Sequence, residues 1–203
     1  MSGYPVVIEG TALAALVVGG GAIGSRRALA LLDAGVRVHV VALDVAQALV
    51  DMAQKKKRLR VSRVEYSPDL IADELLVIAA TNDSATNAAV AADARARGRL
   101  VNVVSSADLG NCTIPAVHRA GDIVVAISAG GVPTAALRLR DAIGETIDAR
   151  YAAAVAVLAT LRRGLLANGH HDRWDEATQA LVGADFCRQV ESGEFSARVA
   201  KWH

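Results

Sequence analysis

The first half of the chain alternates short apolar runs with longer amphipathic stretches. Each run has the length of a buried strand, and the stretches between them place apolar residues at helical spacing. This alternation is typical of a doubly wound α/β fold, in which helices cover both faces of a parallel sheet. The pattern predicts strands near residues 13–18, 36–42, 60–65, 75–80 and 100–104, and helices over 23–34, 45–55 and 84–98.

The pattern changes after Asn111. We expect a short extended segment at 112–115, a second β-like run at 123–128, and a helix over 135–150. The remainder should be helical, with breaks near Gly164, Asn168-Gly169 and Gly193. The middle segment is too small to fold alone, so we expect it to pair with a partner subunit. The predicted parts are a Rossmann-like nucleotide-binding domain (1–111), a β/α dimerisation segment (112–150) and a helical C-terminal domain (151–203).

A glycine-rich turn follows the first apolar run and opens the first predicted helix. Gly19 would allow the tight turn, Gly21 would let the backbone approach a diphosphate, and Gly24 would let the helix lie close to the strand. The diphosphate would bind the N–H groups of the helix N-terminus, at Ala22 and Ile23. The turn therefore predicts a bound dinucleotide, and the alternative is a glycine turn in another kind of doubly wound sheet.

The second predicted strand leads to Asp44, about 20 residues after the last glycine of the turn, where a carboxylate accepts hydrogen bonds from the adenosine ribose. A carboxylate there would repel a 2′-phosphate, so the sequence predicts NAD rather than NADP. Thr81, Asn82 and Asp83 follow the buried strand near 75–80 and should line the same crevice. For each of these three, capping of the following helix is an equally good interpretation.

The bulk properties narrow the class of protein. The 203 residues carry a net charge of +1, and 53% are hydrophobic but only 3% aromatic, which gives no general argument for nucleic-acid or membrane partners. Cys112 and Cys187 lack metal or disulfide spacing and are expected to be reduced thiols. The start of the chain lacks a basic region of the kind that precedes a secretion signal, and the apolar run at 151–161 is too short to span a bilayer. We expect a cytoplasmic protein.

Several short motifs occur in a characteristic order, and together they resemble one family. They lie at residues 17–21, 79–83, 87, 101–104, 113–116, 125–131 and 137–140. In this order they resemble the siroheme-synthase N-terminal family of precorrin-2 dehydrogenases and sirohydrochlorin ferrochelatases. The similarity is good over about residues 5–150 and looser beyond. The Ser128–Gly131 element separates this family from other dinucleotide binders.

The resemblance implies a homodimer that uses NAD to oxidise precorrin-2 to sirohydrochlorin, and some family members also insert Fe2+. The substrate carries many carboxylates, so His118, Arg119 and Arg138 are candidates for binding it. Arg138 and Arg140 are two apart on a predicted helix and cannot share a face, and the alternative for each is a surface arginine. Ser128 matches a family serine near the tetrapyrrole, and its alternative is a helix cap. No spacing of His, Cys and Asp resembles a permanent metal site.

One position departs from the family pattern. Where the family usually has an aspartate that is taken to assist proton removal, this chain has Ser105, and base catalysis is worth about 10²–10⁴-fold. Asp108 could take over this role, or solvent or a substrate carboxylate could accept the proton while the substrate is positioned against NAD. The chain could also have lost one activity or both. A chelatase that no longer oxidises and a nucleotide-sensing binding module therefore stay as alternatives to the dehydrogenase.

Overall fold

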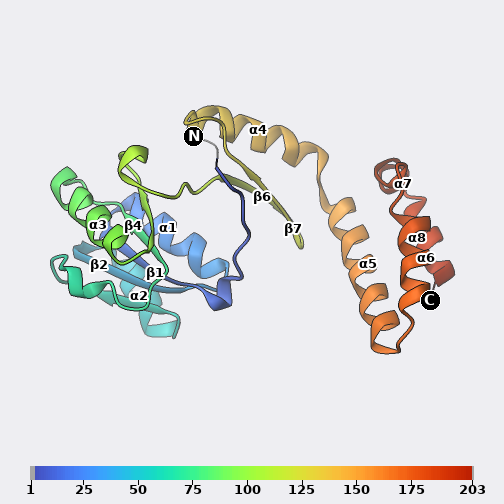
Figure 1. Ribbon diagram of the computed structural model, residues 1–203, viewed down its shortest axis with the longest axis horizontal. Coiled ribbons are helices and arrows are strands. Elements are labelled where there is room, and N and C mark those ends of the chain that lie inside the picture. The colour runs from blue at the N-terminus through green and yellow to red at the C-terminus, as the bar shows by residue number, and fades with distance from the viewer. Residues whose placement is uncertain (1–2, 203) are drawn as a thin grey trace. The chain divides into compact units, whose positions relative to one another are not determined.

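The computed structural model describes residues 3–202, which form two compact units (Figure 1). The first unit ends at Ile114 and the second begins at Pro115. The first unit has an α/β architecture, and the second consists of a β-hairpin and helices. Within residues 3–202, no helix combines the length and the apolar character that crossing a membrane requires.

The first unit is built on a five-stranded parallel sheet with the order β3-β2-β1-β4-β5. The strand order reverses direction between β1 and β4, and ligands of such sheets bind at this point, beyond the carboxyl ends of the strands. The Rossmann-like fold class is therefore confirmed. The elements are β1 (Ala14–Gly20), α1 (Ala22–Asp33), β2 (Arg37–Val45), α2 (Gln47–Lys55), β3 (Leu59–Ser62), β4 (Leu76–Ala79), α3 (Ser84–Ala96) and β5 (Leu100–Val103).

Alternate side chains of the strands enter two separate clusters, one on each face of the sheet. On one face, Val17 of β1 packs in a cluster with Ala28 of α1 and Leu49 of α2. On the other face, Val18 packs in a cluster with Val90 of α3. Helices therefore cover both faces, as the alternating pattern predicted. Both clusters are almost entirely aliphatic, and among residues 3–202 Tyr66 is the one aromatic side chain packed against them.

The strand ends differ most from the prediction in β2 and β3. β2 continues to Val45, so that Asp44 belongs to the strand itself. β3 ends at Ser62, three residues earlier than expected, and the chain then leaves the sheet edge through Val64 and Tyr66. Short 3-10 helices that the pattern did not indicate lie at Gly10–Ala12, Pro68–Leu70 and Ala107–Leu109.

The second unit begins with an antiparallel hairpin of β6 (Ala116–Ala120) and β7 (Ile123–Ile127). The extended segment expected at 112–115 forms no strand, and the first strand of the hairpin, which the pattern did not indicate, starts only after Pro115, which lacks a backbone N–H. The β-like run expected at 123–128 is confirmed as β7. Helices follow: α4 (Pro133–Thr146), α5 (Ala149–Ala167), α6 (His171–Leu181), α7 (Phe186–Ser192), α8 (Phe195–Val199) and a 3-10 turn (Ala200–Trp202).

The helical part differs from the prediction in three places, one of which is an unpredicted break between α6 and α7 at residues 182–185. The expected helix over 135–150 is interrupted, because the Asp148 side chain accepts a hydrogen bond from the Arg150 N–H and begins a new helix, α5. α5 continues through Gly164, where no break occurs. The breaks at 168–169 and at Gly193 are confirmed, and both glycines adopt positive φ values. The division of residues 112–203 into a dimerisation segment and a helical domain stays a prediction.

Candidate dinucleotide-binding site

Three glycines of the turn between β1 and α1 are required by the backbone. At Gly20, a Cβ would lie 2.3 Å from the Asp44 carbonyl oxygen. Gly19 has a φ of 122°, and a Cβ there would overlap the Ala80 carbonyl at the end of β4. A Cβ on Gly24 would overlap the Gly19 carbonyl, because α1 lies directly on β1 at this point. The contacts at Gly19 and Gly24 are the tight turn and the close helix–strand approach that the glycine spacing predicted.

Gly21 occupies open space, in contrast to its neighbours. A Cβ at this position would have no heavy atom within 4 Å, and the residue is extended, with φ −73° and ψ −173°. It is the N-cap of α1, and no side chain caps this helix, so its first N–H groups, at Ala22 and Ile23, lack intrahelical partners. The Ser25 hydroxyl donates to the Gly20 carbonyl at 3.1 Å and holds the turn. The free space and the uncapped amides fit a diphosphate.

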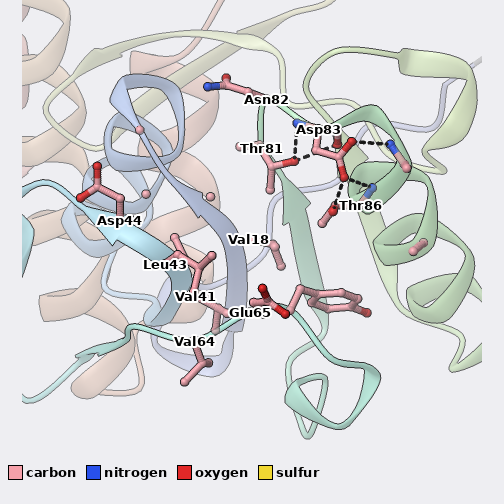
Figure 2. A pocket seen from close by; sticks show the side chains of 18 residues that line it. Val18, Val41, Leu43, Asp44, Val64, Glu65, Thr81, Asn82, Asp83 and Thr86 are labelled. Atoms are coloured by element: carbon pink, nitrogen blue, oxygen red, sulfur yellow. Dashed lines mark hydrogen bonds between the residues drawn. The ribbon is translucent and has the colours of Figure 1, made fainter.

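A pocket of about 730 Å³ extends from this turn along the carboxyl ends of the strands (Figure 2). Its charged lining residues are Asp44, Glu65 and Asp83, all acidic. Figure 2 shows Asp44 and Asp83 on opposite sides of the view. Its walls come from β1 and β2, from the segments after β3 and β4, and from the first turns of α3.

Asp83 is the N-cap of α3. Its carboxylate accepts hydrogen bonds from the Ala85 and Thr86 N–H groups, at 3.2 and 2.9 Å, and from the Thr86 hydroxyl at 2.5 Å (Figure 2). These bonds, the hydroxyl foremost, hold the pKa of Asp83 below its usual value. Asp83 therefore caps α3, which was one of its two expected roles, and it also lines the pocket, which was the other. Thr81 and Asn82 line the pocket as expected.

The segment after β3 forms a wall of the pocket that the sequence did not indicate. Val64, Glu65 and Tyr66 line it. The Tyr66 hydroxyl donates to Asp93 of α3 at 3.0 Å, and burial together with this bond raises the Tyr66 pKa. The ring is thereby fixed at the pocket edge. No sequence motif marks these residues. They reach the site because the chain crosses from β3, at the sheet edge, to β4.

Ser105 and Asp108, the catalytic candidates, follow β5 closely. Ser105 is exposed and accepts a hydrogen bond from the Asn87 amide at 3.4 Å. Asp108 is exposed in a 3-10 turn, and its carboxylate makes no hydrogen bond or ion pair with the residues that the structure describes. Asn102 donates to the Cys112 carbonyl at 3.1 Å and thus ties down the following loop.

The candidates for binding substrate belong to the second unit. The His118 ring nitrogen Nε2 lies 2.7 Å from the Ile147 carbonyl, which gives this side chain a partner within its own unit. Arg119 on β6 and Arg138 on α4 are exposed. Arg140 pairs with Asp141, at 2.5 Å. Their roles toward substrate stay predictions.

Ser128 lies after β7 and is exposed. The N-cap of α4 is Val132, so the alternative of Ser128 as a helix cap is wrong. Within residues 3–202, no three His, Cys, Asp or Glu side chains come together as metal ligands.

The fold and the pocket define a dinucleotide-binding Rossmann protein. The model of the family described as "Putative NAD(P)-binding" matches residues 6–116, which is more than half of the chain. The chain therefore belongs to this family, and a nicotinamide dinucleotide is the class of cofactor that the family indicates.

Known proteins extend this relationship. The chain is 38% identical over 152 residues to the siroheme synthase of Chromobacterium violaceum, covering 74% of this chain and 32% of that protein. It is 35% identical over 163 residues to the siroheme synthase of Nitrosomonas eutropha, covering 80% and 34%. It thus spans about a third of the length of these curated relatives. A solved structure named "SirC, precorrin-2 dehydrogenase" matches with a TM-score of 0.77 and 28% identity, covering 98% of this chain and 99% of that one. The resemblance to the siroheme-synthase N-terminal family is confirmed.

Proposed function

We propose that the protein oxidises precorrin-2 to sirohydrochlorin with NAD as the hydride acceptor. The observation that carries this proposal is the similarity to a precorrin-2 dehydrogenase over 98% of this chain and 99% of the other. The open space at Gly21 and the uncapped amides of α1 support it, because they fit the diphosphate of the cofactor. Bound NAD would accept the hydride, and the oxidation would release a proton together with sirohydrochlorin and NADH.

NAD rather than NADP is favoured by the charge of the pocket. Asp44 stands at the end of β2, where the adenosine ribose would lie, and its carboxylate would accept hydrogen bonds from the ribose hydroxyls. Glu65 lines the same pocket, and no Lys or Arg is among the lining residues. A 2′-phosphate would therefore meet carboxylates without a compensating cation.

We infer that Asp108 accepts the proton. Its carboxylate is exposed just beyond β5, at the edge where ligands of this fold bind, and no neighbour among residues 3–202 neutralises it. A carboxylate is a far better base than a neutral hydroxyl, which leaves Ser105 a different role. Solvent is the alternative acceptor.

A homodimer is supported by the hairpin of the second unit. A two-stranded sheet is marginally stable alone, and α4 packs against β6 and β7. Val117 and Val124 of the hairpin each remain 37% exposed, and Leu137 and Leu139 of α4 remain 43% and 50% exposed. A second copy would cover such apolar side chains. Light scattering on the purified protein should give the mass of a dimer, and we expect the dimer in the cytoplasm.

The activity is tested with purified protein, precorrin-2 and NAD, by following the absorbance of NADH and of sirohydrochlorin. Both should rise together, in equal amounts. The absence of both products would overturn the proposal. Iron insertion into supplied sirohydrochlorin, without NADH formation from precorrin-2, would instead identify the chelatase-only alternative. A protein that binds NAD but neither tetrapyrrole would point to the nucleotide-sensing module.

A further inference from the structure

Asn87 lies on α3, 2% exposed, and connects the carboxyl ends of β4 and β5. We propose that Asn87 is a positioning residue that holds the Ser105 hydroxyl as a hydrogen-bond donor toward an acceptor group on the bound ligand. The inference rests on the proposed function, since the ligand is NAD or the tetrapyrrole. Ser105 would then be a binding group rather than a base.

The orientation of the Asn87 amide is fixed by the backbone of Thr81. The Thr81 N–H donates to the Asn87 side-chain oxygen at 3.1 Å, and the Asn87 side-chain nitrogen donates to the Thr81 carbonyl at 3.0 Å. Exchanging the oxygen and the nitrogen would set donor against donor and acceptor against acceptor. Only one orientation therefore satisfies both backbone groups.

The second N–H of the same nitrogen determines the role of Ser105. It points to the Ser105 hydroxyl oxygen, 3.4 Å away, so this oxygen accepts a hydrogen bond. The hydroxyl has a single proton, which is left to be donated elsewhere. No acceptor for it occurs among the hydrogen bonds of residues 3–202. Because Ser105 is exposed just after β5, this proton is available to a ligand beyond the strand ends.

The ligand group that receives the Ser105 proton is a hydrogen-bond acceptor, either a carboxylate of the tetrapyrrole or the carboxamide oxygen of NAD. Both share an oxygen that receives an O–H donor, and separate titrations distinguish them. Ser105→Ala removes the donor, Ser105→Thr retains it, and Ser106→Ala is the matched control, because the Ser106 side chain makes no cap hydrogen bond. Affinity is measured by calorimetry for NAD alone and by absorbance for sirohydrochlorin alone.

Ser105→Ala should weaken the binding of one ligand by about tenfold, the effect of losing one hydrogen bond to a charged or strongly polar acceptor. Ser105→Thr and Ser106→Ala should bind both ligands nearly as the unchanged protein does. The ligand whose affinity falls is the one that carries the acceptor. Unchanged affinity of Ser105→Ala for both ligands would overturn the proposal.

Asn87→Asp tests the positioning role, because it keeps the shape and the acceptor oxygen but replaces the donor with a second acceptor. The Ser105 hydroxyl would then turn inward and donate to the new carboxylate. Ligand affinity should fall as far as in Ser105→Ala, and combining both changes should add little. A purely structural role would instead give an effect on affinity that adds to the effect of Ser105→Ala.

Independent effects of the two substitutions on affinity would refute the positioning role. Urea unfolding of each variant separates loss of binding from loss of stability. If Asn87→Asp does not fold, the Ser105 and Ser106 variants still decide the donor role. Suppose that the unchanged protein oxidises precorrin-2 and that Ser105→Ala binds NAD and sirohydrochlorin as tightly as the unchanged protein does. That result would refute this inference but leave the proposed function standing. An unchanged protein that binds neither NAD nor sirohydrochlorin would overturn the proposed function as well.

Discussion

Replacing Gly21 with alanine should impair cofactor binding without harming the fold. The residue is extended and a Cβ there meets no heavy atom within 4 Å, so the folded protein accepts the methyl group without strain. Removing a glycine also lowers the conformational entropy of the unfolded chain, so the free energy of unfolding should stay constant or rise by up to about 1 kcal/mol. The methyl group would occupy the space that the diphosphate needs next to the amides of α1.

The size of the binding defect follows from the bonds that the diphosphate would lose. A hydrogen bond to a charged group contributes about 1.5–3 kcal/mol, so displacement from one amide should weaken NAD binding by about 10- to 150-fold. Calorimetric titration with NAD measures this effect directly. Urea denaturation of the same sample shows whether the fold is retained.

Two further glycine substitutions serve as controls. Gly164→Ala lies in the interior of α5, where a Cβ meets nothing, and should leave NAD affinity unchanged. Gly24→Ala should instead destabilise the protein by about 1–3 kcal/mol, because its Cβ overlaps the Gly19 carbonyl and α1 must move off β1. NAD binding by Gly21→Ala equal to that of the unchanged protein would refute the assignment of the diphosphate site.

Three other predictions concern charge and proton transfer. Asp44→Asn should weaken NAD binding and raise the affinity for NADP relative to NAD by up to about fivefold, the size of one exposed charge interaction, as measured by titration with both cofactors. Asp108→Asn should lower kcat by about 10²-fold or more with little change in KM, and equal kcat values would show that solvent takes the proton. Burial, then the charge of Arg60, lowers the pKa of His39, and these outweigh the opposing effect of Glu74. The unfolded chain therefore binds the proton first, so stability should be constant above about pH 6.5 and fall as the pH drops below it. Urea midpoints across this range should vary less in His39→Gln.

The sheet and the glycine turn were predictable because their signals are local. The short apolar runs identify buried strands, and the spacing of Gly19, Gly21 and Gly24 reports a turn that few other residues permit. The acid at the end of β2 follows from the same motif. These signals depend on neighbours in the chain, so the sequence alone carries them.

Features that depend on competing local signals or on distant contacts were missed. The break between α4 and α5 is set by a capping bond of Asp148, which the apolar pattern of the surrounding helices conceals. Gly164 signals a break but costs only helix propensity at a site without neighbours, so α5 continues. The pocket wall at 64–66 depends on the crossover that carries the chain from β3, at one edge of the sheet, past β2 and β1 to β4. The buried position of Asn87 did have a sequence signal, because Asn87 lies three residues before the buried Val90 and so shares its face of α3.

The aliphatic core of the first unit makes the two units optically distinct. Both tryptophans, Trp174 and Trp202, pack against the core of the second unit, whereas Tyr66 stands at the dinucleotide pocket. Tryptophan emission therefore reports the melting of the helical region alone. Unfolding of the nucleotide-binding half, which contains no tryptophan, must be followed by circular dichroism, because tyrosine fluorescence also includes Tyr151 of the second unit.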